Sequence, residues 1–478
     1  MKDGVRPRFG WTAIFGAWLI LVITPILIEW SRHCFSNYDL GIYTQALSLI
    51  RWGDWNPWLS VREIRVFNDH FDPILLWVAP WVRGSEPTLR ALIVEFGFVL
   101  AAAILIWKHS RPLLFPTAFF LLGSATTTAL GFPVHPGTWA VFPLTGLLIS
   151  LQNPEAGRAS LLWAAFLLMF KEEYVPVLAV LATSRILFQK RLGVPLLLLA
   201  LAWGIGVFYL RPKLLGGTES YTEGFLAFWL QDPIHAAKVR LLDWGIWRGL
   251  GAATLPAIVW IGSLFAQRST SLRTLVRSDA LFVFLSLLGI RFVSGRWGHH
   301  YWIPLAACLA VLIPPRFKVE RRWAMASWIL LLTFQLSYLG KSSLKTLFRA
   351  GPAHCSADPE RLQELEQVSM FLEGRPRSTV VAPNALIPRI ISSERTQLHP
   401  LENARELPNP PFWLLTQVHP SAKHWPTDGA TTQARALKLR EGKNVVTVLE
   451  GRWVRLDWVE WRKRERFHRE AQFARSSP

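Results

Sequence analysis

Acidic residues and a histidine gather in two stretches that follow the first long apolar run of the chain. Asp39 lies in the first stretch, and Asp69, His70 and Asp72 lie close together in the second. Beside a membrane, one carboxylate can take a proton from an attacking hydroxyl. Others can hold a divalent cation that neutralises a phosphate leaving group. All four residues are therefore candidates for the reaction or for substrate binding, and Asp69 and Asp72 are the candidate metal ligands.

Each stretch also has a purely structural explanation. Ser36 precedes Asp39 at the spacing of a helix capping box, and the helix dipole favours a carboxylate in the first turn of a helix. Asp69, His70 and Asp72 equally fit a polar turn before an apolar segment. Capping does not exclude catalysis, so both interpretations stay open.

A second group of ionisable residues interrupts a later apolar run at Lys171, Glu172 and Glu173. Such residues are costly at membrane depth and usually face a cavity or a charged partner. Lys171 could bind a phosphate there, with one of the two glutamates, Glu172 or Glu173, orienting it or binding metal. The alternative is the tip of a helical hairpin at the membrane interface, where most of the cost vanishes.

Further candidates lie at the ends of apolar runs, namely His135, His300 and Tyr301. A single histidine at an interface is usually only an amphipathic anchor, so His135 alone is a weak signal. Arg211 and Lys213 could grip a phosphate, although two basic residues at a helix end are common.

The elements that position these residues are predicted to be membrane helices. Of the 478 residues, 51% are hydrophobic and 18% are charged, and apolar runs of roughly 20 residues recur up to about residue 340. About eleven transmembrane helices are expected. Their predicted ranges are 11–29, 88–107, 112–131, 138–151, 160–170, 175–188, 193–210, 245–266, 279–293, 300–314 and 323–340.

The basic loops predict the orientation of these helices. A cytoplasmic, uncleaved N-terminal helix puts the most basic short loops inside and the long first loop, 30–87, outside. Reading 160–188 as two short helices keeps the basic residues after it inside. The same orientation places every candidate residue on the outer face of a cell membrane.

The net charge of +19 does not indicate a nucleic-acid partner, because Lys and Arg cluster in short loops that meet anionic lipid headgroups. The 25 Trp residues also suit a membrane interface. Three scattered cysteines indicate neither a zinc site nor a disulfide framework. Walker-type, GxGxxG and HExxH motifs are absent from the sequence, and the oligomeric state stays open.

The chain is predicted to have two domains, a transmembrane domain over 1–340 and a soluble extracytoplasmic domain over 341–478. In the second, 358–373 has helical apolar spacing, 378–382 is typical of a short buried strand, and 445–449 with 453–458 indicates a hairpin. The expected fold is a polytopic α-helical membrane protein with a small α/β C-terminal domain.

The two acidic stretches together resemble DUF2079, a family of predicted membrane proteins of unknown function. The matching residues are Tyr38-Asp39-Leu40-Gly41-Ile42-Tyr43-Thr44-Gln45 and Asp69-His70-Phe71-Asp72-Pro73-Ile74, then His135-Pro136, Lys171-Glu172-Glu173, His300-Tyr301 and the stretch 380–401. The chain departs from the family at Gly137, where members often carry an acidic residue. It also departs at the Lys-Glu-Glu triplet, which is closer to Lys-Glu-Asp in the family.

The layout of this family is similar to that of C-type integral-membrane glycosyltransferases, which use polyprenyl-phosphate-linked sugars. That similarity implies a membrane glycosyltransferase with Asp39 as general base, and with Asp69 or Asp72 supporting it or holding a divalent cation. Lys171, Glu172, His70, His135, His300 and Tyr301 would bind the substrate or its phosphate. The alternatives are a transporter or flippase of a lipid or small solute, for which Glu95 is the exceptional midspan charge, and a non-catalytic assembly protein.

Overall fold

The computed structural model describes sixteen stretches of the chain. They are 6–32, 38–51, 53–61, 63–82, 86–111, 113–215, 229–266, 277–294, 299–313, 321–341, 358–375, 378–383, 386–390, 397–401, 408–419 and 429–461. These residues form two compact units. The helical unit comprises Met1–Ile26, Val66–Trp77 and Leu92–Leu344, and the sheet unit comprises Leu27–Arg65, Val78–Ala91 and Lys345–Pro478.

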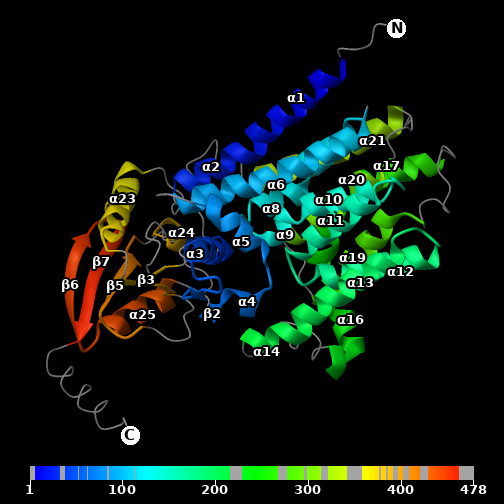
Figure 1. The fold of residues 1–478 in the computed structure, drawn as a ribbon. Helices are drawn as coiled ribbons and strands as arrows, with labels where there is room; N and C mark the ends of the chain where they lie inside the picture. Colours follow the sequence, from blue (N-terminus) through cyan, green and yellow to red (C-terminus); the bar gives the residue numbers. More distant parts are fainter. Residues whose placement is uncertain are drawn as a thin grey trace. The chain divides into compact units, whose positions relative to one another are not determined.

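The helical unit is built from the apolar runs of the sequence (Figure 1). The first helices that lie wholly or partly in it are α1 (Arg6–Trp18), η1 (Leu19–Ile23), α2 (Thr24–Ser31), α4 (Val66–Asp69), α5 (Ile74–Val78), α6 (Pro87–Ser110), α7 (Phe115–Leu122), α8 (Ser124–Leu130), α9 (Pro136–Trp139), α10 (Val141–Ser150), α11 (Gly157–Leu168) and α12 (Tyr174–Leu187). The later ones are α13 (Gly193–Gly204), η3 (Ile205–Leu210), α14 (Arg211–Leu215), α16 (Pro233–Leu242), α17 (Trp244–Ala266), α19 (Asp279–Ser294), η4 (His299–Tyr301), α20 (Ile303–Leu312) and α21 (Arg321–Lys341). Every range that the sequence predicts as a span contains helix among its described residues.

Two details of this helical order differ from the prediction. The expected single helix 112–131 is broken into α7 and α8, because Gly123 takes an extended conformation (φ −70°, ψ 153°). The segment 211–244, predicted as a loop, contains α14 and α16. By contrast, the interpretation of 160–188 as two helices is confirmed, since α11 and α12 are separated by the turn that carries Lys171.

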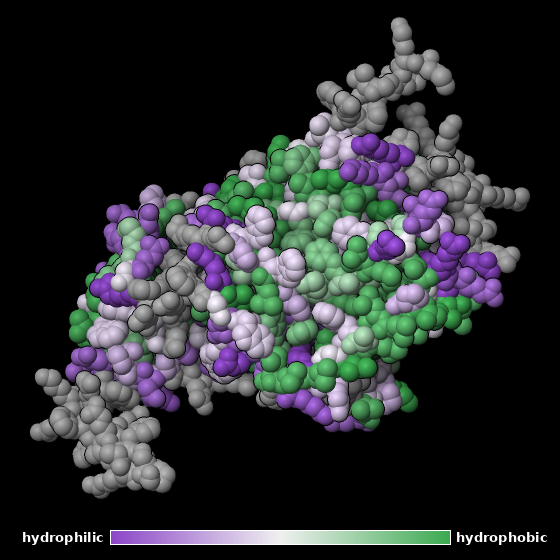
Figure 2. Space-filling model, viewed as in Figure 1, coloured by the Kyte–Doolittle hydropathy of each residue, from purple (hydrophilic) through white to green (hydrophobic). Residues whose placement is uncertain are grey.

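Three helical segments of the described chain are long and apolar enough to cross a membrane, namely Gly10–Ser31, Pro87–Ser110 and Gly193–Leu215. The third presents a row of exposed hydrophobic side chains, including Leu198 at 62% and Ile205 at 57% exposure. The visible face of the helices is largely hydrophobic (Figure 2). An apolar surface of this extent is unfavourable in water and favourable against lipid.

The sheet unit contains a five-stranded mixed sheet in the order β4-β3-β5-β7-β6 (Figure 1). The strands are β3 (Thr379–Ala382), β4 (Gln397–Pro400), β5 (Phe412–Gln417), β6 (Lys443–Glu450) and β7 (Val454–Trp461). Strands β4, β3 and β5 are parallel, and β7 pairs antiparallel with both β5 and β6. The predicted C-terminal strand and hairpin are therefore confirmed, whereas β4 and β5 were not predicted.

Helices cover both faces of this sheet. Ala436 and Leu439 of α25 (Gly429–Arg440) pack in one core with Phe412 and Leu414 of β5. Neighbouring residues in a strand point to opposite faces. The ring of Trp413 accordingly contacts Phe371 of α23 (Pro359–Glu373), with 5.0 Å between ring centroids, on the other face.

The first-loop helix α3 (Tyr38–Arg51) is also part of the sheet unit. The Gln45 amide donates to Ser60 Oγ at 2.8 Å, and Ser60 Oγ accepts the backbone N–H of Leu398 in β4 at 2.8 Å. A Cβ atom at Gly41 would lie 3.1 Å from the Ile387 side chain in α24 (Ile387–Ile390). These close contacts fix α3, and with it the backbone of Asp39, against the C-terminal residues.

Candidate functional site

The two polar stretches around residues 70 and 171 meet in the helical unit. His70 Nδ1 lies 2.7 Å from Glu172 Oε1, and the backbone N–H of Phe71 donates to Glu172 Oε2 at 3.2 Å. Backbone bonding adds a third link, because the N–H of Ile74 donates to the Met169 carbonyl at 3.0 Å. The loop after α4 is therefore held against the turn between α11 and α12.

The His70–Glu172 pair favours the charged form of both side chains. Burial alone would lower the pKa of His70, but the Glu172 carboxylate outweighs it and raises that pKa above its ordinary value. Burial would likewise raise the pKa of Glu172, but His70 and Lys171 hold it below its usual range. In the described structure Glu172 hydrogen-bonds to His70 and to the backbone of Phe71, and no hydrogen bond joins it to Lys171.

Asp72 lies on the same loop and is completely buried. Burial raises the pKa of its carboxyl to about 7, against an attraction from His70 that would lower it. A carboxyl that titrates near neutral pH can both accept and return a proton under ordinary conditions. Asp72 therefore differs from Glu172, although both side chains belong to one cluster.

Lys171 is the buried cation of the cluster, with only 3% of its surface exposed. Its Nζ lies 3.4 Å from His135 Nε2 and 5.6 Å from the centre of the Tyr301 ring. Burial would lower the pKa of Lys171, but Tyr301, Glu173 and Asp72 raise it above its ordinary value. The ammonium group thus stays charged in a site nearly closed to water.

Arg291 adds a second buried cation that the sequence analysis did not single out. It comes from α19, is 2% exposed, and its Nη2 lies 2.7 Å from Glu173 Oε1. Its guanidinium stands 4.2 Å from the centre of the Tyr301 ring, a geometry that suits a cation–π contact. The sequence did offer a signal for Arg291, because a charged residue inside an apolar run such as 279–293 usually faces a cavity or a charged partner.

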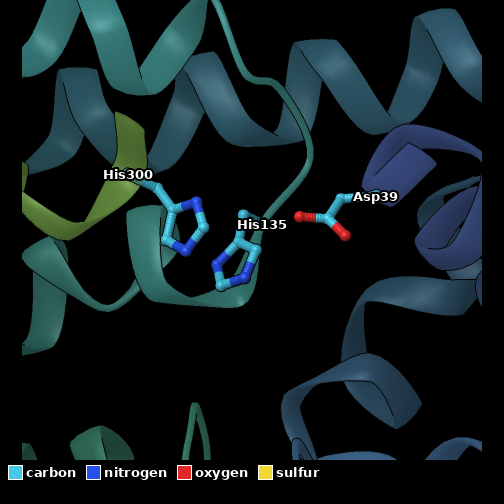
Figure 3. A group of neighbouring side chains, drawn as sticks. All are labelled: Asp39, His135 and His300. Carbon is cyan, nitrogen blue, oxygen red and sulfur yellow. The ribbon is translucent and has the colours of Figure 1, made fainter. Parts of the chain in front are cut away.

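His135 and His300 stack ring on ring, with centroids 3.3 Å apart (Figure 3). The N–H of Gly137 donates to His135 Nδ1 at 3.0 Å, so this nitrogen carries no proton. Burial, with the positive charge near it, lowers the pKa of His135 well below its ordinary value. The imidazole is therefore neutral beside the charged Lys171.

A buried carboxylate holds the loop that carries His135. Glu95 of α6 accepts the backbone N–H of Val134 at 2.7 Å and that of His135 at 3.1 Å. Val134 has φ 62°, a left-handed conformation that a β-branched residue rarely adopts. Both Glu95 oxygens are engaged with this backbone, so its role is to position His135.

Gly137, the position where family members often carry an acid, lies against both histidines. A Cβ atom there would be 3.0 Å from His135 Nδ1 and 3.5 Å from the His300 ring. A larger side chain at 137 would need the stacked rings to shift.

Arg211 begins α14 at the end of the long apolar helix 193–215. Its guanidinium lies 6.0 Å from the centre of the Phe71 ring and is attracted by Glu172, Asp72 and Asp69. Its Nε and Nη1 atoms are buried and have no hydrogen-bond partner within the described part of the chain. Buried N–H donors without an acceptor are costly, and they favour an incoming anion.

Asp39 lies in the first turn of α3 and is half-buried, and it belongs to the sheet unit. The capping residue proposed for this helix, Ser36, lies outside the described residues. The structure gathers seven of the other predicted site residues in the helical unit, namely His70, Asp72, Lys171, Glu172, His135, His300 and Tyr301. Asp69 is the last residue of α4, directly before His70.

Comparison with known proteins places the chain among predicted membrane proteins. The profile of the family "Predicted membrane protein (DUF2079)" matches residues 34–444. No curated protein matches by sequence. Among solved structures, the chain is similar to ArnT from Cupriavidus metallidurans, crystallised with undecaprenyl phosphate, with a TM-score of 0.48 and 12% identity over 92% of this chain and 98% of that one.

Proposed function

We propose that this chain, which belongs to the DUF2079 family of predicted membrane proteins, transfers a sugar from a polyprenyl-phosphate carrier to an acceptor at the outer face of the membrane. The chain is a multi-pass membrane protein, as its family and its long apolar helices show. The proposal combines that lipid-facing surface with the buried charged cluster of the helical unit.

The observation that carries the proposal is Arg211, whose buried Nε and Nη1 atoms have no hydrogen-bond partner among the described residues. A lipid-linked sugar brings its phosphate to the end of a membrane helix, which is where Arg211 stands. Arginine N–H groups form strong charge-assisted hydrogen bonds with phosphate oxygens, and Nε and Nη1 of Arg211 could each donate one such bond. An exposed apolar helix, 193–215, runs directly up to this residue, so the prenyl chain would lie along it.

The buried cations suit the chemistry of the departing carrier. In the transfer, the acceptor oxygen bonds to the anomeric carbon while the bond from that carbon to the phosphate oxygen breaks, so negative charge builds up on the phosphate. Fixed positive groups in a site with little water stabilise such charge strongly. Lys171 and Arg291 are both charged and nearly inaccessible to water. Lys171 is held beside His135 and Arg291 is held by Glu173, so both need little reorganisation during the step.

The acceptor hydroxyl must also lose its proton. The family layout implies Asp39 as the base, since it is the acidic residue soon after the first helix. Asp72, which belongs to the helical unit and has a pKa of about 7, is the alternative general base. The divalent cation expected at Asp69 and Asp72 stays a prediction. It is tested by measuring sugar transfer with added Mg²⁺ and again after the metal is chelated.

Sugar transfer by Asp39→Asn tests the catalytic assignment. Membranes containing the protein would be incubated with radiolabelled polyprenyl-phosphate sugars, and transfer from the lipid fraction would be counted. Replacing the carboxylate with an amide removes the proton acceptor, so we expect at least a hundredfold loss, on the order of one general-base contribution.

The matched control is Asp54→Asn, an exposed aspartate elsewhere in the sheet unit. It should transfer sugar at the wild-type rate. Wild-type transfer by a folded, membrane-inserted Asp39→Asn variant would remove Asp39 from the reaction.

A further inference from the structure

The sheet unit has a cavity of about 230 Å³ on the face covered by α25. Leu401, which follows β4, and Thr416, near the end of β5, line it from the sheet side. Gln433, Ala436 and Arg440 line it from α25. Strands β4 and β5 are both parallel to β3, and the cavity lies at their carboxyl ends, where α/β sheets usually bind ligands.

The polar groups of the cavity are few and fixed. Arg440 donates from Nε to Asp457 Oδ2 at 2.8 Å and from Nη2 to Thr416 Oγ1 at 3.2 Å. Asp457 is completely buried and also accepts from Thr447 and Arg455, so the guanidinium is locked in place. Arg440 Nη1 makes no hydrogen bond within the residues that the structure describes, and it is therefore available to a ligand.

The remaining wall is a mixture of apolar and uncharged polar side chains. Leu401, Ala436 and Leu437 offer an apolar surface, whereas Thr416 and Gln433 offer hydroxyl and amide groups. The positive charge of Arg440 is balanced by Asp457, at 2.6 Å, so a strongly anionic ligand gains little. Small-molecule pockets run from roughly 300 Å³ upward for drug-sized ligands, and this cavity is smaller.

We infer that this cavity binds one ring of a neutral saccharide. A sugar ring has a face of C–H groups, which suits the leucine and alanine wall, and an edge of hydroxyls, which suits the hydroxyl, amide and guanidinium groups. Its small size and lack of net charge fit a single ring better than a nucleotide, a phosphate or a lipid tail. If the proposed transfer is correct, this saccharide belongs to the acceptor.

The experiment measures binding of the methyl glycosides of common hexoses and pentoses to the full-length protein in lipid nanodiscs. Saturation-transfer NMR detects weak binding of such small ligands and requires no enzyme activity. Gln433 is exposed at the rim, so Gln433→Trp should fill the mouth without disturbing the core. Ala434→Trp is the matched control, because Ala434 is exposed on the same helix and lies outside the cavity lining.

We expect at least one glycoside to bind the wild-type protein and the Ala434→Trp variant, with affinity reduced about tenfold or more in Gln433→Trp, which is about 1.4 kcal/mol. Absence of binding for every glycoside would overturn the inference, and so would equal binding by both tryptophan variants. The Asp39→Asn variant separates this site from the proposed function, since it should bind the glycoside normally while failing to transfer sugar. Glycoside binding without transfer from any polyprenyl-phosphate sugar would sustain this site and contradict the transferase.

Discussion

Neighbouring carboxyl groups in the cluster around Lys171 have opposite ionisation preferences. His70 and Lys171 hold the pKa of Glu172 below its usual range, so this carboxyl is ionised. Burial raises the pKa of Asp72 to about 7, so this carboxyl keeps its proton up to about neutral pH. The motif around Asp69 indicated that these residues could do chemistry. The pairing of His70 with Glu172 could not be predicted, because no local pattern links two residues so far apart in the chain.

The pH dependence of stability should reveal the buried Asp72. Its carboxyl binds its proton more tightly in the folded state than in the unfolded state, whose pKa is near 3.8. The stability that this proton contributes is therefore lost as the pH rises from about 4 through 7. The loss in the free energy of unfolding is at most about 1.4 kcal/mol for each unit by which the two pKa values differ. Asp72→Asn removes this loss, so it should raise the Tm in detergent more at pH 8 than at pH 4.5.

The control is Asp243→Asn, because Asp243 is an exposed aspartate. This variant should change the Tm by the same amount at pH 4.5 and at pH 8. If Asp72→Asn changed the Tm equally at pH 4.5 and pH 8, the raised pKa of Asp72 would be wrong.

At the scale of elements, short connections between helices position the cluster. Helix positions follow from apolar runs long enough to be recognised in one sequence, and α11 and α12 were separated correctly because charged residues interrupt their run. The break between α7 and α8 was missed, since it depends on the extended backbone of Gly123 alone.

Glu95 was noted as a midspan charge that a transporter would need. Its bonds to two backbone N–H groups explain it without transport.

Glu95→Ala should destabilise the helical unit. The change leaves the N–H groups of Val134 and His135 without their acceptor in a buried loop, and each such group costs roughly 1–3 kcal/mol. We expect a loss of about 2–6 kcal/mol in the free energy of unfolding, measured by chemical denaturation in detergent. Glu155→Ala, at an exposed turn, should leave stability within about 0.5 kcal/mol of wild type.

Equal stability of the Glu95→Ala and wild-type proteins would show that the loop does not depend on this carboxylate. A stable variant with an altered environment of His135, seen by histidine NMR, would instead support the positioning role alone.

At the scale of the whole molecule, the sequence predicted a membrane-embedded helical part and a C-terminal α/β part, and both are present. The sheet unit also includes α3 and the rest of Leu27–Arg65, held by Ser60 and Ile387. Periodicity cannot reveal such long-range packing, because each segment satisfies its own local pattern. The orientation, with the N-terminus in the cytoplasm and the C-terminal residues outside, stays a prediction from the charged loops.

Direct binding of a phosphate-bearing lipid tests the central claim that the charged cluster receives the carrier. Native mass spectrometry would compare polyprenyl phosphate with the uncharged polyprenol on the wild-type protein, on Arg211→Met, and on the control Lys213→Met, whose exposed ammonium bonds to Tyr209. We predict that the wild type and Lys213→Met prefer the phosphate form, and that Arg211→Met weakens its binding about tenfold, or about 1.4 kcal/mol. Equal binding of polyprenol and polyprenyl phosphate by the wild type, or an unchanged preference in Arg211→Met, would contradict the account.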